Sequence, residues 1–129
     1  MSNPGNFFSA LAENFMDESL APQDRHANAT MLVTTMQEFY NDKTYWELMP
    51  PDLKNTIQNS GLCSLISPNY QIQKSAANLV SKVYVLRFRA NNKWPDLIEN
   101  LSKNVQSPKP EIQQASILTL GYLCEELHS

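Results

Sequence analysis

The sequence has few of the features that mark membrane, secreted or β-sheet proteins. Its 129 residues include no apolar run of about 18, and the first basic residue is Arg25, so it predicts neither a membrane span nor a signal peptide. Only 3 glycines occur, and their positions form no phosphate-binding loop. The one dense β-branched and aromatic run, residues 83–86, lies inside a longer helical pattern. We therefore expect a helical protein of the cytoplasm and nucleus.

The 8 prolines lie between helical patterns or just inside them. They divide the chain into six helical segments, which we group into antiparallel hairpins at about residues 4–41, 51–90 and 94–127. Residues 41–50 form a linker with room for a short turn around Trp46. Breaks near Pro22, Pro68 and Pro108 recur at about 40 residues, the period of two-helix solenoid repeats. The expected fold is one all-α solenoid domain over residues 1–129.

The last third of the chain carries the clearest helical pattern. One stripe has the i, i+3, i+4, i+7 spacing of a single-faced helix: Trp94, Leu97, Ile98, Leu101 and Val105. The next helix is apolar over more than half its circumference: Ile112, Ala115, Ile117, Leu118, Leu120, Leu123, Cys124 and Leu127. Such a helix needs cover on two sides, as in stacked repeats. We expect Leu120, Leu123 and Leu127 to be buried and Gly121 to permit close helix packing.

No set of residues supports catalysis or a cofactor. The two cysteines, Cys63 and Cys124, and the two histidines, His26 and His128, show no metal-ligand spacing and no nucleophile beside a base. We therefore expect both cysteines to be small core residues and the protein not to be an enzyme. No cofactor and no metal site is predicted. The tryptophans Trp46 and Trp94 open apolar stripes, so helix packing explains them better than ligand stacking.

The charge distribution is informative locally. A formal net charge of -3 argues against nucleic acid as the partner. Residues 70–93 nevertheless contain no acid, and they carry five cations: Lys74, Lys82, Arg87, Arg89 and Lys93. Lys74, Asn78, Lys82 and Arg89 can share one helix face. This face is either an ordinary solvated surface or a basic strip that binds an acidic protein partner.

Two segments resemble a HEAT repeat near the amino-terminal end of importin-β. They are KWPDLIENL at residues 93–101 and QASILTLGYLCE at residues 114–125. The likeness is strong over residues 93–127, fair over residues 44–92 and weak over residues 1–43. It implies a HEAT-repeat-type α-solenoid segment and a protein-binding module of nucleocytoplasmic protein import. The alternative is a HEAT-like scaffold that organises another protein assembly.

The same resemblance implies a partner and an orientation. In the importin-β family the second helix of each repeat lines the inner surface, and the amino-terminal repeats hold the GTP form of the small GTPase Ran. The helices that begin near Pro22, Tyr70 and Pro110 would then face inward. Cargo and adaptor proteins bind the family largely through later repeats. Because the chain ends just after an amphipathic helix, we expect further repeats or a partner to cover that end.

Overall fold

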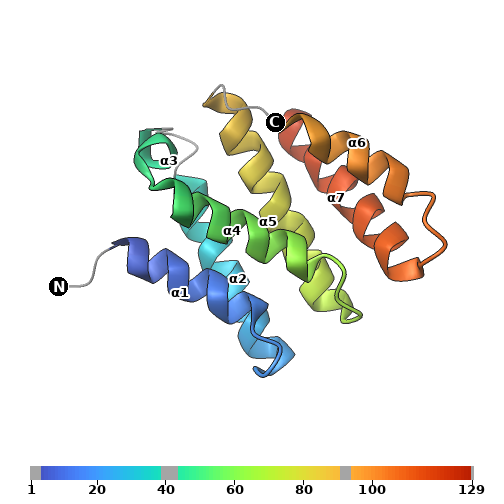
Figure 1. Cartoon of the computed structure of the whole chain (residues 1–129), viewed down its shortest axis with the longest axis horizontal. Coiled ribbons are helices and arrows are strands. Elements are labelled where there is room, and N and C mark those ends of the chain that lie inside the picture. Colours follow the sequence, from blue (N-terminus) through green and yellow to red (C-terminus); the bar gives the residue numbers. More distant parts are fainter. Residues whose placement is uncertain (1–3, 39–43, 91–93, 129) are drawn as a thin grey trace.

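The computed structural model describes residues 4–38, 44–90 and 94–128, and this part of the chain forms α-helices without a strand (Figure 1). The helices are α1 (Pro4–Met16), α2 (Pro22–Gln37), α3 (Thr44–Leu48), α4 (Pro51–Ser64), α5 (Tyr70–Arg89), α6 (Pro95–Asn104) and α7 (Pro110–His128). The predicted all-α class is confirmed. The short helix α3 replaces the expected linker turn around Trp46.

Helix starts follow the local chemistry that the sequence indicates. Proline stands in the first turn of α2, α4 and α6, where its missing N–H costs no helical hydrogen bond. α5 begins differently, because Asn69 is its N-cap and the side-chain oxygen accepts a hydrogen bond from the Ile72 N–H at 3.1 Å. Turn residues thus fix where each long helix begins.

The helices stack as neighbouring hairpins. α1 packs on α2, α4 on α5, and α6 on α7. Between hairpins, α1 contacts α4, while α2 contacts α5 and α5 contacts α7. The second helices of the hairpins therefore form one continuous layer, which we call the α2–α5–α7 layer. In Figure 1 this layer lies behind α1, α4 and α6.

One contact between α4 and α5 depends on a glycine. A Cβ atom built on Gly61 would lie only 2.8 Å from Val80 Cγ2, so α4 approaches α5 more closely there than any other residue permits. Gly121 behaves in the opposite way, since a Cβ atom on it would meet no atom within 4 Å. The expectation that Gly121 permits close packing was wrong, and Gly61 has that role.

Several apolar side chains of α7 are less covered than expected. Leu123 is buried at 2% exposure, but Leu127 is 52% exposed, and Leu120 is only partly buried. Cys124, and Cys63 on α4, are exposed, so the expectation that both thiols belong to the core was wrong. The reason is that α5 and α6 cover one side of α7 and leave the side with Ile117 and Cys124 open.

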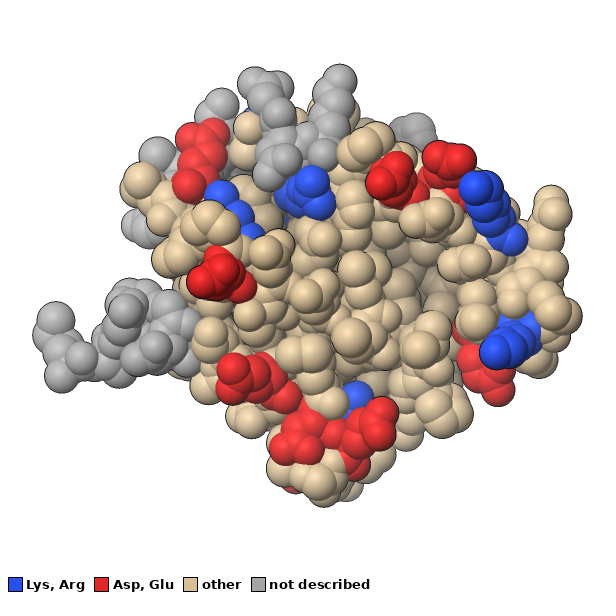
Figure 2. All heavy atoms as spheres, viewed as in Figure 1, with Lys and Arg blue, Asp and Glu red and all other residues tan. Residues whose placement is uncertain are grey.

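Charged side chains are distributed unevenly over the face shown in Figure 2. Acidic side chains gather at the lower end of the view, where α1 leads into α2, and uncharged side chains form the middle of the face. Asp17 lies in this connection and accepts hydrogen bonds from Ser19 Oγ at 2.5 Å and from the Ser19 N–H at 2.9 Å. Both bonds lower the pKa of Asp17 from its ordinary value, and the bond from the Ser19 hydroxyl group has the larger effect.

None of the helices within residues 4–38, 44–90 and 94–128 has the length and apolar character needed to cross a lipid bilayer.

Candidate protein-binding surface

A groove of about 430 Å³ runs along the α2–α5–α7 layer between α2 and α5. We call it the α2–α5 groove. Its lining residues recur at spacings of three and four on each helix, so one stripe of each helix faces the groove. They are His26, Ala29, Thr30, Val33, Thr34 and Gln37 of α2, Gln71, Lys74, Ser75 and Asn78 of α5, and Tyr122 of α7.

The groove has an apolar floor and polar walls. Ala29 and Val33 are buried at its base. The side chains of Gln37, Gln71 and Asn78 present amide groups, each of which can donate and accept, and the structure gives these amides no hydrogen bond within the described residues. Lys74 is exposed on the α5 wall and has the one permanent charge among the described lining residues. The groove can therefore bind a polar partner.

His26 and Ser75 face each other across the groove, and His26 Nδ1 is hydrogen-bonded to Ser75 Oγ at 2.6 Å. A catalytic serine–histidine pair also needs a third group that orients the imidazole. Within the described residues His26 has no such partner, since its ring makes no hydrogen bond besides that to Ser75. The pair connects α2 to α5 at the level of the groove.

The structure divides the predicted basic strip. Lys74 and Asn78 lie together on the wall of the α2–α5 groove. Lys82, one turn further along α5, is 7% exposed and forms a salt bridge with Glu126 of α7. Arg89 is exposed near the end of α5 and does not line the groove. The four residues therefore do not form one open surface, because an acid from the next hairpin neutralises Lys82.

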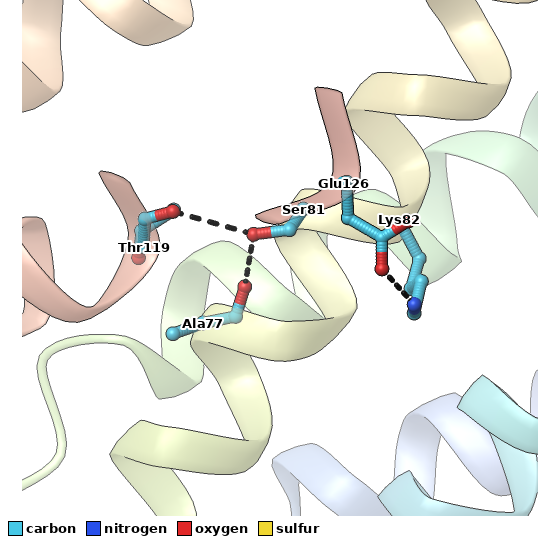
Figure 3. A network of polar contacts seen from close by, with 5 residues as sticks. All are labelled: Ala77, Ser81, Lys82, Thr119 and Glu126. Carbon is cyan, nitrogen blue, oxygen red and sulfur yellow. Dashed lines mark hydrogen bonds and ion pairs between the residues drawn. The ribbon is translucent and has the colours of Figure 1, made fainter. Parts of the chain in front are cut away.

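Polar groups connect α5 to α7 beneath this face (Figure 3). Ser81 Oγ lies 2.8 Å from the Ala77 carbonyl oxygen and 3.4 Å from that of Thr119. Further along the same interface, Gln73 Nε2 donates to the Glu111 carbonyl oxygen at 2.8 Å. With the salt bridge of Lys82, these bonds fix the register between the second and third hairpins.

Comparison with known proteins identifies the family. Importin subunit beta-1 of Schizosaccharomyces pombe is 35% identical over 123 residues, which are 91% of this chain and 14% of that protein. Importin subunit beta-1 of Saccharomyces cerevisiae is 33% identical over 76 residues, 58% of this chain and 9% of that protein. The chain belongs to the importin-β family. It spans only about a seventh of the length of its first relative. No protein-family model matches it.

The fold of this importin-β-family chain also matches a solved structure. A chain of the Kap95:Nup1 complex superposes with a TM-score of 0.82 at 24% identity, over 93% of this chain and 15% of that one. The match confirms the predicted α-solenoid of HEAT-repeat type.

Other candidate residues of this importin-β-family chain serve packing. Trp46 is 1% exposed, and Lys54 Nζ lies 5.6 Å from its ring centre. The Arg87 guanidinium lies 5.1 Å from the Trp94 ring centre and donates a hydrogen bond to Gln58 Oε1 at 3.0 Å. Burial lowers the pKa of Arg87 from its ordinary value. The tryptophans thus pack between elements, as the sequence predicts. Lys93 lies outside the described residues, within which no three His, Cys, Asp or Glu side chains converge on a metal position.

Sequence reasoning found two of the groove residues and missed the others. Lys74 and Asn78 were predicted from the charge pattern of α5. The α2 wall was missed, although His26, Thr30, Thr34 and Gln37 recur at helical spacing along that helix. The sequence signal for the α2 wall was a stripe of polar residues that lies between apolar stripes on that helix. A helix face that is merely exposed to solvent shows the same pattern, so the signal was not specific.

Proposed function

We propose that this chain is a protein-binding segment of a nuclear transport receptor and that its α2–α5–α7 layer binds Ran in the GTP form. The proposal extends the family assignment from fold to partner. In support, two importin subunits beta-1 are 33–35% identical to it over the aligned residues. The family resemblance leads us to expect that α2, α5 and α7 face inward. The corresponding role is protein import between cytoplasm and nucleus. The chain acts by binding, and no catalytic step is assigned to it.

One observation supports this face over the others. The α2–α5 groove lies on the layer that we expect, from the family resemblance, to face inward. Together with Lys74 it presents amide groups that make no hydrogen bond within the described residues. Polar groups without internal partners are suited to binding a protein surface. We assign cargo and adaptor binding to parts of a receptor outside this segment, because the chain corresponds to 14% of its S. pombe relative.

A nucleotide-dependent pull-down tests the proposal. The immobilised chain is incubated with Ran loaded either with a non-hydrolysable GTP analogue or with GDP. We expect retention of the GTP form only, with modest affinity because the segment is a small part of its relatives. The longer S. pombe relative serves as the positive control. Equal retention of the two forms, or retention of neither while the relative retains the GTP form, contradicts the proposal.

A further inference from the structure

We propose that the α2–α5 groove binds an extended acidic segment of a protein partner, with one Asp or Glu carboxylate placed on Lys74. The inference rests on the proposed function, in that it treats the α2–α5–α7 layer as the partner-binding face. It goes further by naming the chemical class of the bound segment and the residues that bind it.

The dimensions of the groove fit an extended chain. Beyond the hydrogen bond between His26 and Ser75, its α2 wall reaches from Thr30 to Gln37, which is roughly 10 Å at a rise of 1.5 Å per residue. About three residues of extended peptide cover that length. The volume of about 430 Å³ lies within the ordinary range of binding pockets, about 300–1,000 Å³.

The polar walls provide for the backbone of such a segment. The amides of Gln37 and Gln71 stand on opposite helices, and Asn78 adds a third. Each amide can accept from a peptide N–H and donate to a peptide carbonyl, and none is engaged within the described residues. Thr34 is exposed on the α2 wall, and its hydroxyl group makes no hydrogen bond within the described residues, so it is available to the segment in the same way. Small side chains of the segment can rest on the floor formed by Ala29 and Val33.

The charge of the groove selects an acidic segment. Lys74 is exposed on the wall, and no Asp or Glu occurs among the described lining residues, so its charge is not compensated inside the groove. Lys82 adds no second cation there because Glu126 neutralises it. One ammonium group suits one carboxylate, whereas a nucleic acid strand would require a row of cations. A basic segment would meet repulsion from Lys74.

Two synthetic peptides test the proposal directly. Each peptide has seven residues, with Ala and Ser alternating on both sides of a central residue and with blocked ends. The central residue is Glu in one peptide and Gln in the other. Each is titrated into the isotope-labelled full chain, and binding is followed by NMR. We expect the Glu peptide to shift signals of Lys74, Asn78 and Gln37, and to bind about tenfold more tightly than the Gln peptide, as for a hydrogen bond to a charged group. Equal binding of the two peptides, or shifts confined to other helices, overturns the proposal.

Matched lysine variants complete the test. Lys74→Gln removes the charge of the groove, and Lys109→Gln removes that of an exposed lysine between α6 and α7. The preference for the Glu peptide should disappear in Lys74→Gln and persist in Lys109→Gln. Loss in both variants, or persistence in both, contradicts the groove assignment. Because both side chains are exposed, circular dichroism should show both variants folded.

The same proteins separate this inference from the proposed function. If the Glu peptide binds at Lys74 while Ran in the GTP form is not retained, the proposed function fails and the groove assignment stands. If Ran is retained but the Glu peptide gives no shift at the groove, the groove assignment fails and the proposed function stands.

Discussion

Lys82 of α5 forms a salt bridge with Glu126 of α7, 44 residues later in the chain (Figure 3). The two side chains are only 9% and 15% exposed. Removing two charges from water is costly, and the pair repays this only while both partners remain. The salt bridge therefore has two consequences. It fixes the third hairpin against the second, and it leaves Lys74 as the cation of the α2–α5 groove.

Removing the charge of Lys82 should destabilise the fold. Lys82→Met keeps most of the side-chain volume but removes the ammonium group that forms the salt bridge with Glu126, so we expect a loss of about 2–4 kcal/mol in the free energy of unfolding. Urea denaturation measures the loss. The double variant Lys82→Met/Glu126→Leu should recover most of it, because neither charge then remains.

The exposed salt bridge between Lys103 and Glu99 supplies the control for that experiment. Its partners lie one turn apart on α6 with side chains 70% and 64% exposed, and pairs of this kind contribute about 0.3–0.5 kcal/mol. Lys103→Met should therefore change stability little. A loss in Lys82→Met as small as that of this control would show that the salt bridge of Lys82 contributes little to the stacking of the hairpins.

The two helical glycines should respond in opposite directions to alanine. Gly121→Ala should stabilise the protein by about 0.5–1 kcal/mol, because its Cβ atom meets open space and alanine favours the helix. Gly61→Ala should destabilise it by about 1–2 kcal/mol net, because the new methyl group collides with Val80. Thermal and chemical denaturation of the two variants measure the difference. A stabilising Gly61→Ala would contradict the close approach of α4 to α5.

Two leucines of α7 test which side of that helix is covered. Leu123→Ala should cost about 2–5 kcal/mol, the range for truncating a buried leucine. Leu127→Ala, at a side chain 52% exposed, should cost under about 0.5 kcal/mol. Denaturation in urea compares them. Similar losses at the two positions would mean that α7 is covered on both sides in solution.

The turn between α1 and α2 predicts a pH effect. Because the folded state lowers the pKa of Asp17, this carboxylate contributes stability that is present above its unfolded pKa and is lost as the pH falls through the lower folded value. Ser19→Ala removes the hydroxyl donor, so the pKa of Asp17 should rise toward 3.8, whereas Ser19→Thr should preserve the shift. Carboxyl-carbon NMR titration measures both. An unchanged pKa in Ser19→Ala would assign the shift to another cause.

The helices could be predicted from the sequence because their signals are local. Prolines such as Pro22 and Pro95 mark helix starts, and the stripe of Leu97 and Leu101 marks the buried face of α6. How many neighbours cover a helix is not a local property. The apolar pattern of α7 therefore predicted burial at Leu127 and Cys124, where the described helices provide no cover.

The candidate site was only partly predictable for the same reason. The helical period alone placed Lys74 and Asn78 on one face of α5. It also placed Lys82 there, because nothing near Lys82 in the sequence indicates that Glu126 lies opposite. Likewise, the contact of His26 with Ser75 joins positions 49 residues apart, so the α2 wall emerged only from the stacking of the hairpins.

The most direct test of the account is calorimetric binding of Ran in the GTP form to the unaltered chain, to Lys74→Glu and to Lys109→Glu at two salt concentrations. The two variants make the same change in net charge, but only Lys74 lines the α2–α5 groove. We predict that Lys74→Glu weakens binding at least tenfold and flattens its salt dependence, while Lys109→Glu stays close to the unaltered chain. Equal binding by all three proteins would contradict the assignment of the α2–α5 groove, with Lys74, as part of the surface that binds Ran.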